Sequence, residues 1–331
     1  MSLPIAVIGA GLAGIACARS LRAAGYAPVL FDKGRGPGGR VATRRGKAPD
    51  GTALQWDHGA QYFSARDPGF AAALAAAGAV PWPDPRRFTG TPGISSIGRI
   101  LADGLTIHTA RHVTRLEGGP GAWVVHHADR ALLHPLPPET PAGPFAAVAI
   151  ALPAPQAAPI ADPFIPALAA RCAEAVYAPC WTVMAAFGEL LPLPDTWRST
   201  AGPVAWAARE SAKPGRPSTE AWTIQAAPAW SREHLEDAPE TIVAPLLAAL
   251  GMPAPLVATA HRWRYSLVEH AIGTPCLFDA DQGLGLAGDW CLGGRGEAAW
   301  QSGTALAEAI IARGFAGPTA GFPRHGSSHD R

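Results

Sequence analysis

This sequence of 331 residues contains few lysines and few cysteines, and its net charge is close to zero. A formal net charge of +1 gives no electrostatic reason to expect a nucleic-acid partner or binding to an anionic membrane surface. The five cysteines are scattered without the spacing of a metal site, which favours reduced thiols in a cytoplasmic protein with no bound metal. No cationic stretch precedes the first apolar run, so we expect no signal peptide.

Long uninterrupted hydrophobic stretches are also missing. The longest segment without a charged residue lies between Glu139 and Asp162, and it contains five prolines. Because proline interrupts a helix, this segment does not predict a membrane-spanning helix. The chain is long enough for one large domain, or for two closely joined domains with a sizeable core.

The strongest positive signal lies at the start of the chain. Residues 5–8 are apolar and predict a buried strand, and residues 15–21 predict a helix. The turn between them carries the dinucleotide fingerprint G-x-G-x-x-G, with its glycines at Gly9, Gly11 and Gly14. The first glycine permits the tight turn, the second the approach of a pyrophosphate, and the third close packing of helix on strand. Bound phosphates would then lie at the helix N-terminus, formed by Leu12 and Ala13.

A second strand and a second glycine-rich loop follow the fingerprint. The strand at residues 28–31 ends in Asp32, 18 residues after the last fingerprint glycine, where a ribose-binding acid is expected. In the loop at residues 33–40, Gly39 would let the backbone fold against a bulky cofactor, and Arg40 would place a guanidinium on its phosphates. The alternative interpretation is a flexible surface loop.

Two further glycine-centred segments complete the pattern. Residues 56–63 read Trp-Asp-His-Gly-Ala-Gln-Tyr-Phe, and residues 283–289 predict a strand that ends in Gly-Asp. A glycine loop then leads into a helix at residues 296–312. Cofactor signals at both ends of the chain favour FAD over NAD as the tightly held dinucleotide. Cys291 is a candidate for covalent flavin attachment, although a buried packing thiol is the simpler interpretation.

These motifs, in this order, resemble the flavin amine-oxidase superfamily and, within it, the renalase branch with its bacterial relatives. The resemblance implies an α/β fold, with a Rossmann-like FAD-binding domain of the glutathione reductase/p-hydroxybenzoate hydroxylase type. An α+β substrate domain on an antiparallel sheet would be inserted into it. The implied division places residues 1–80, 93–154 and 274–316 in the FAD domain, 81–92 and 155–273 in the substrate domain, and 317–331 in a disordered tail.

The resemblance also implies which residues hold FAD, which would be bound non-covalently. Val113 falls where a backbone contact to the adenine is usual, and the Gly-Asp pair with the following helix start would hold the pyrophosphate–ribityl part and the N1–C2 carbonyl side of the flavin. The implied cofactor residues are Gly9, Gly11, Leu12, Ala13, Gly14, Asp32, Lys33, Gly39, Arg40, His58, Gly59, Gln61, Val113, Gly288, Asp289, Glu297 and Ala298.

The scarcity of lysine bears on the reaction. Amine-oxidising members of the superfamily carry a lysine that holds a water near flavin N5, whereas none of Lys33, Lys47 and Lys213 falls on a predicted strand of the substrate domain. Renalase-like enzymes instead oxidise dihydro-NAD(P) isomers reduced at the 2- or 6-position to NAD(P)+, and O2 then reoxidises the flavin to give H2O2. The alternatives are an amine oxidase or desaturase of the same superfamily, and a non-catalytic flavin-binding protein.

Alternation along the predicted strand at residues 259–266 suggests the substrate site, because alternate residues share one face of a strand. His261, Trp263 and Tyr265 would line that face, and Tyr62 would close the front. His58 is expected to be a structural partner of its loop rather than a base. An arginine would take a substrate pyrophosphate, with Arg209, Arg216 and Arg264 as candidates. The plainer alternative makes the aromatics sheet core and the arginines a solvated face. The expected oligomer is a monomer or homodimer.

Overall fold

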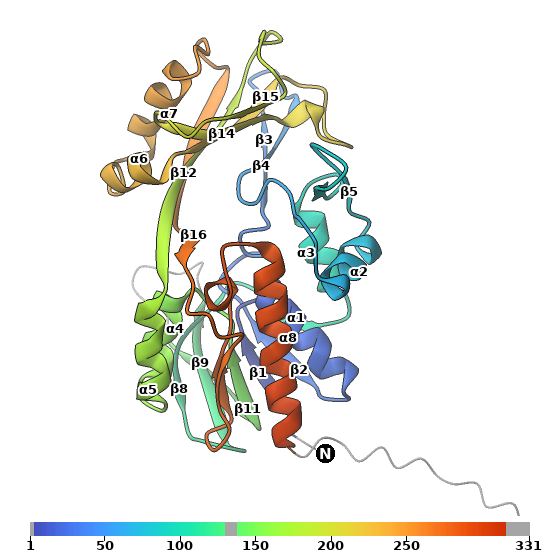
Figure 1. The fold of residues 1–331 in the computed structure, drawn as a ribbon, viewed down its shortest axis with the longest axis vertical. Helices are drawn as coiled ribbons and strands as arrows, with labels where there is room; N and C mark the ends of the chain where they lie inside the picture. Colours follow the sequence, from blue (N-terminus) through green and yellow to red (C-terminus); the bar gives the residue numbers. More distant parts are fainter. Residues whose placement is uncertain (1–2, 130–137, 316–331) are drawn as a thin grey trace, which may run out of the picture.

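The structure is a computed structural model that describes residues 3–129 and 138–315. Figure 1 shows two halves stacked along the long axis of the molecule. We call the part built on a six-stranded sheet the lower half, and the part built on a five-stranded sheet the upper half. The expected mixed α/β class, with an antiparallel sheet inserted between segments of a Rossmann-like unit, is confirmed.

The sheet of the lower half has the strand order β17-β18-β11-β1-β2-β7. Neighbouring strands are parallel except at the edge pair β17–β18. Its strands come from both ends of the described chain: β1 (Ile5–Ile8), β2 (Pro28–Phe31), β7 (Thr106–His108), β11 (Ala147–Ile150), β17 (Leu277–Asp279) and β18 (Leu284–Leu286). The strands β1 and β11 are fully buried apolar tetrapeptides, as expected for a parallel sheet covered on both faces.

Alternate residues of β1 pack against two different layers. Ile5 and Val7 face α1 (Leu12–Ala23) and α8 (Gly296–Arg313), which lie side by side in Figure 1. Ala6 and Ile8 face the opposite layer, which contains an antiparallel ribbon and two short helices. This second layer consists of β8 (Arg111–Glu117), β9 (Trp123–Asp129), β10 (Thr140–Phe145), α4 (Ala154–Ala161), α5 (Pro166–Ala170) and the 3-10 turn η2 (Arg171–Glu174).

The upper half is an antiparallel sheet in the order β13-β14-β15-β12-β16. Trp181 and Val183 pack with two helices on one face, and the intervening Thr182 and Met184 point to the other face, toward the lower half. The elements are β12 (Val176–Ala186), β13 (Thr196–Arg198), β14 (Val204–Arg209), η3 (Glu210–Ala212), β15 (Ala221–Ala226), α6 (Pro228–Glu233), α7 (Pro239–Ala248) and β16 (Val257–His270).

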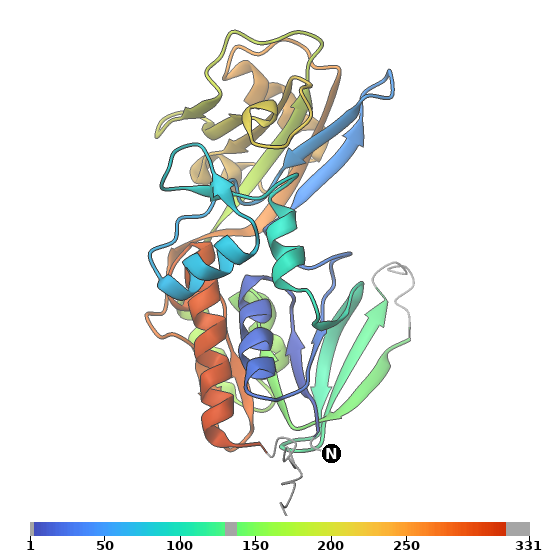
Figure 2. The same cartoon turned by 90° about the vertical axis from the view of Figure 1, so that its right-hand side faces the viewer.

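A hairpin and a group of short elements connect the halves. Figure 2 shows the hairpin β3 (Thr43–Lys47)–β4 (Ala53–Asp57) rising from the lower half alongside the upper sheet. Trp56 anchors it, because its indole N–H donates to the Ala185 carbonyl at 3.0 Å. The remaining connecting elements are α2 (Pro68–Ala76), β5 (Val80–Pro81), β6 (Phe88–Thr89), α3 (Ser95–Leu101) and η4 (Asp289–Cys291).

Two segments lie in a different half from the one expected. Helices α4 and α5 share the apolar core of the lower half, so the insertion begins at β12 and not at residue 155. The β3–β4 hairpin, expected in the FAD domain, packs on the upper sheet instead. The predicted tail at 317–331 lies outside the described residues. Among the helices of residues 3–129 and 138–315, none has the length and apolar character needed to cross a bilayer.

Candidate functional site

The turn before α1 has a space beside its backbone. A Cβ at Gly9, whose φ is +101°, would lie 2.5 Å from the Ala151 carbonyl oxygen, and one at Gly14 would lie 1.8 Å from the Gly9 oxygen. The packing of the protein itself therefore requires these two glycines. Gly11 differs, because its φ is −75° and no atom of the described residues beyond its chain neighbours lies within 4 Å of a Cβ placed there. The protein leaves this position open to a ligand.

Two helices begin at the same place. A Cβ at Gly296, the first residue of α8, would lie 3.2 Å from Leu12, the first residue of α1. Neither helix has a side-chain hydrogen bond at its N-cap, which is Gly11 in α1 and Arg295 in α8. First-turn N–H groups without capping side chains, together with the dipoles of two neighbouring helices, favour a bound anion. This arrangement suits the diphosphate of a dinucleotide.

The carboxylate of Asp32 lies next to this turn. It accepts hydrogen bonds from the backbone N–H groups of Ala10 and Gly34, each at 2.6 Å. These bonds hold it at the carboxyl end of β2, where lone pairs remain for a ribose hydroxyl.

A cavity of about 440 Å³ opens beside the end of β2. Lys33 and Val113 line it, and both were expected to contact FAD. The pairing of β8 with β9 shifts register between Val113 and Arg115, which frees backbone groups at this point of the ribbon. The volume lies within the range of about 300–1,000 Å³ typical of small-molecule sites. The cavity therefore offers a place for the adenosine end of a dinucleotide.

Arg40 and Asp289, 249 residues apart, form an ion pair of 2.7 Å. The Arg40 guanidinium also donates to the Ser266 carbonyl at 2.8 Å and to the Tyr265 carbonyl at 3.3 Å. It therefore joins the second glycine-rich loop, the Gly288–Asp289 turn and strand β16 at one point.

Glu297 and Cys291 have different surroundings from those expected. The buried Glu297 carboxylate accepts from the backbone N–H groups of Arg66 and Asp67, just before α2, so this side chain is used by the protein itself. Only the backbone N–H groups of Glu297 and Ala298 remain suited to the expected cofactor role. Burial raises the pKa of the Cys291 thiol to about 12, which keeps it protonated and suits the packing interpretation.

Four buried charged side chains lie behind the loop of residues 57–63. The two cations contact the two anions: Lys213 Nζ lies 2.8 Å from Glu210 and 3.4 Å from Asp57, and Arg216 lies 2.5 Å from Asp57. Each of these side chains is at most 2% exposed. We call this set the charge quartet: Asp57, Glu210, Lys213 and Arg216.

The burial of Lys213 was not predicted from the sequence. Lys213 follows η3 and lies on no strand, as expected, yet its side chain is fully buried beside the loop. Its ammonium donates to Glu210, to Asp57 and, at 3.0 Å, to Gln61 Oε1. Three acceptors use its three N–H bonds, which leaves none to hold a water. The lysine positions Gln61, whose amide in turn donates to the carbonyls of Asp57 and Gly59.

The two carboxyl groups of the quartet have pKa values shifted in opposite directions. Burial alone would raise the pKa of Asp57, but Lys213 and Arg216 outweigh it and hold that pKa below its usual value. Burial and the neighbouring Asp57 charge raise the pKa of Glu210. The hydrogen bonds of Asp57 to Thr43 at 2.7 Å and to the Ile94 N–H at 3.0 Å add to this asymmetry.

His261 and Trp263 meet the loop from strand β16, as expected. The Trp263 indole donates to the His58 carbonyl at 2.9 Å, and the rings of His58 and His261 lie 5.1 Å apart. Gln225 of β15 donates to the Gly59 carbonyl at 2.8 Å. Tyr265 lies further along β16, where its ring packs on Tyr177 at 5.5 Å.

His58 is a poor base at this position. Burial, followed by the neighbouring His261 and Arg44, lowers the pKa of His58 to about 3. Its Nδ1 is buried and has no hydrogen-bond partner among the described residues. A buried nitrogen without a partner suits a site that a bound cofactor completes.

We expect His58 to make stability fall in mild acid. Its folded-state pKa of about 3 lies below its usual 6.5, so between these values the unfolded chain binds a proton that the folded chain does not. The free energy of unfolding therefore falls as the pH drops through this window, by up to about 1.4 kcal/mol per pH unit. Unfolding of wild type and His58→Gln at about pH 6 and pH 5 measures this. Equal pH slopes in the two proteins would contradict it.

The arginines expected at the substrate site are occupied elsewhere. Arg209 is buried and donates to Asp195, to Glu220 and to two backbone carbonyls. Arg264 lies on the opposite, helix-covered face of the sheet and pairs with Glu236 through two contacts of 2.7 Å. Arg216 belongs to the charge quartet. Arg209 and Arg216 are thus held by buried partners, and Arg264 lies on the face of the sheet away from His261, so none of the three fits the role of binding a substrate phosphate beside His261.

Two other arginines surround Tyr62. Arg198 of β13 donates to the Tyr62 hydroxyl at 2.6 Å, and the Arg87 guanidinium lies 4.8 Å from the centre of the Tyr62 ring. Neither arginine was predicted from the sequence, because a loop residue and a residue of a three-residue strand have no periodicity to place them. The position of Arg198 near Tyr62 could have been inferred only from the register of β13 with β14, which pairs Arg198 with Trp206.

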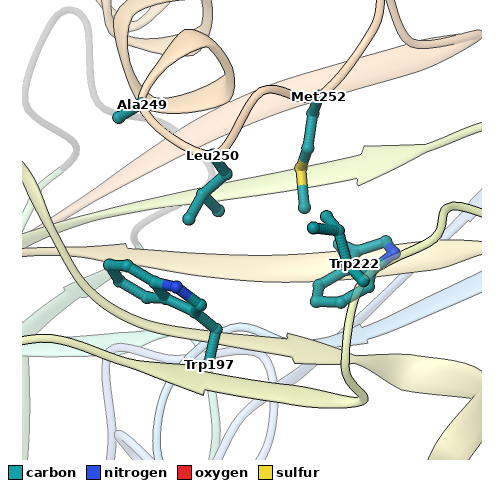
Figure 3. Close-up of a pocket in the computed structure, with 6 residues that line it drawn as sticks. Trp197, Trp222, Ala249, Leu250 and Met252 are labelled. Carbon is teal, nitrogen blue, oxygen red and sulfur yellow. The ribbon is translucent and has the colours of Figure 1, made fainter.

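A second, smaller cavity lies away from the loop. It has a volume of about 140 Å³, and Figure 3 shows Trp197 and Trp222 facing Leu250 and Met252 across it. Trp222 belongs to the core on the helix-covered side of the upper sheet, so the cavity opens on the opposite face from His261. No group of three or more potential metal ligands is gathered among the described residues.

Comparison with known proteins identifies the architecture. Residues 7–76 match the family model of the NAD(P)-binding Rossmann-like domain. The structure is similar to that of a provisionally assigned protoporphyrinogen oxidase from Exiguobacterium sp. 255-15, with a TM-score of 0.72 and 13% identity over 94% of this chain and 99% of that one. It is also similar to wild-type putrescine oxidase bound to putrescine, with a TM-score of 0.69 and 13% identity over the same shares. Residues 7–76 therefore belong to a Rossmann-like unit, and the chain has the fold of these oxidases.

Proposed function

We propose that this protein binds FAD non-covalently and is an FAD-dependent oxidoreductase. The open space at Gly11, between two helix starts that lack capping side chains, is the observation that carries the proposal. Asp32 and the cavity beside Val113 would take the adenosine end. The unpartnered Nδ1 of His58 and the Gly288–Asp289 turn would adjoin the flavin. The fold shared with protoporphyrinogen oxidase and putrescine oxidase supports this class of enzyme.

We propose further that the reaction is renalase-like. FAD, when bound, accepts a hydride and passes the electrons to O2, which becomes H2O2. The hydride donor would be a 2- or 6-dihydro isomer of NAD(P), which leaves as NAD(P)+. A dihydropyridine needs no base to donate its hydride, and this agrees with the surroundings of the loop: His58 has a low pKa, and all N–H groups of Lys213 are used within the protein.

The residues around the loop would then orient the donor ring. His261 and Trp263 form one wall with rings 4.5 Å apart, and Tyr62 forms another beside Trp206. Flat aromatic walls would hold a dihydropyridine face-on and exclude water, so that the hydride travels over van der Waals distance. His261 would hydrogen-bond the carboxamide. These roles require positioning rather than proton transfer.

Anaerobic mixing tests the proposal. Partly borohydride-reduced NAD+, which contains the 2- and 6-dihydro isomers, should bleach the flavin absorbance within seconds, and admission of O2 should restore the colour with one equivalent of H2O2. Putrescine, the ligand of a protein with the same fold, serves as the amine control and should leave the flavin oxidised for minutes. Bleaching by the amine but not by the isomers would overturn the renalase-like reading and favour an amine oxidase.

A further inference from the structure

One row of side chains crosses the whole upper sheet on the side that faces the loop. The register pairs Arg198 with Trp206, Trp206 with Gln225, Gln225 with Thr182, and Thr182 with His261. Directly paired residues project from the same face of a sheet, so all five lie on one side. Four interstrand spacings of about 4.8 Å separate the backbones of the first and last residue by about 19 Å. The row thus joins the Arg198 edge of the sheet to His261, and its middle is covered by the loop, since Thr182 is fully buried and Gln225 donates to the Gly59 carbonyl.

The Arg198 end of this row carries unneutralised positive charge. No carboxylate of the described residues lies within 4 Å of the Arg198 guanidinium, which is held instead by the Tyr62 hydroxyl and stacks on Trp206 at 5.1 Å. The Arg87 guanidinium lies over the Tyr62 ring, and among the described residues it pairs only with the partly exposed Asp84, at 3.0 Å. Among the described residues, Asp84 is thus the only carboxylate that pairs with either guanidinium, whereas Arg209 alone pairs with both Asp195 and Glu220.

A third hydrogen-bond donor accompanies these two. Trp206 is only 9% exposed, and its buried indole N–H has no hydrogen-bond partner among the described residues. Its ring contacts Tyr62 at 5.7 Å and Trp82 at 6.4 Å. An oxygen-rich anion bound beside the Arg198 guanidinium, which stacks on this ring, would supply the missing acceptor.

We propose that Arg198 and Arg87, which both contact Tyr62, form with the Trp206 indole an anion subsite that binds a phosphate of the substrate. Planar guanidinium groups match the geometry of phosphate oxygens, which makes arginine the preferred residue for such contacts. Tyr62 positions the two cations. The inference rests on the proposed function, and it assigns to these residues the recognition of the phosphate that a dihydronicotinamide nucleotide carries and that the free base or an alkyl derivative lacks.

The test compares isomeric dihydro compounds with and without phosphate: the dinucleotide, the mononucleotide and the N-methyl compound. In wild type, we expect phosphate to tighten binding in the anaerobic reductive half-reaction by about tenfold or more. Arg198→Ala should remove most of this preference, and Arg87→Ala part of it. Arg86→Ala, the neighbouring exposed arginine, is the matched control and should keep it. Equal preference in wild type and Arg198→Ala would overturn the subsite.

A binding measurement separates this inference from the proposed function. NAD+ and inorganic pyrophosphate are titrated into the oxidised holoprotein and followed by calorimetry and by the flavin spectrum. If both probes bind more weakly to Arg198→Ala than to Arg86→Ala, the subsite is supported. This holds even if no dihydro isomer bleaches the flavin, because the absence of bleaching would reject only the renalase-like reaction. Wild-type affinity for both probes in Arg198→Ala would reject the subsite, whatever the half-reaction shows.

Discussion

Replacement of Lys213 by methionine is expected to lower the free energy of unfolding by about 3–5 kcal/mol, because removal of one partner leaves a buried charge uncompensated. In the charge quartet, two cations balance two anions with side chains at most 2% exposed. Without Lys213, Asp57 and Glu210 share Arg216 alone, and Gln61 loses the donor of its Oε1. Chemical denaturation followed by tryptophan fluorescence measures the change.

Two variants sharpen this prediction. Lys47→Met changes a lysine that is exposed on β3, so it should shift stability by no more than about 0.5 kcal/mol. The double variant Lys213→Met/Glu210→Gln restores charge balance in the quartet and should recover about 1 kcal/mol or more of the loss. A Lys213→Met protein within about 1 kcal/mol of wild type would show that the quartet contributes little to stability.

Addition of a single methyl group at Gly11 is expected to weaken FAD binding by about 100-fold, equivalent to about 2.7 kcal/mol. The φ of −75° accepts alanine, and the Cβ would enter the open space where the diphosphate is expected. Stability of the cofactor-free protein should change by about 1 kcal/mol or less, as is usual at an N-cap. The flavin-to-protein absorbance ratio after gel filtration, and a reconstitution titration, measure the affinity.

The matched comparison is Gly14→Ala, which adds the same methyl group three residues later. There the Cβ would lie 1.8 Å from the Gly9 oxygen, so the strand and helix must separate and the fold itself should be destabilised. We therefore expect Gly11→Ala to give a stable protein that has lost its flavin, and Gly14→Ala to give a protein with a lower free energy of unfolding. Full flavin content in Gly11→Ala would contradict the assignment of the open space to the cofactor.

Features that depend on neighbouring residues were predictable. The fingerprint turn, the position of Asp32 and the buried strand β11 follow from local patterns of glycine, carboxylate and apolar residues. The alternation of β16 correctly separated His261 and Trp263 from Arg262 and Arg264, because successive side chains of a strand point to opposite faces.

Features that depend on distant partners were not predictable. The Lys-Pro-Gly-Arg segment of residues 213–216 reads as an exposed loop, since a lysine and an arginine normally stay in water. Its two cationic side chains are buried because Asp57, 156 residues before Lys213, and Glu210 supply the compensating charge. The polar strand β3 and the packing of α4 on the lower half likewise depend on surfaces that distant segments provide.

The sequence by itself determined that the chain begins with a nucleotide-binding turn and that an aromatic face lines β16, because backbone geometry and strand periodicity act over a few residues. Only the tertiary structure decided which arginines are available to a ligand. Arg209, Arg216 and Arg264 carry the same charge as Arg198, but their carboxylate partners reach them across the fold. Ion pairing depends on distance in space, and spacing along the chain does not encode that distance.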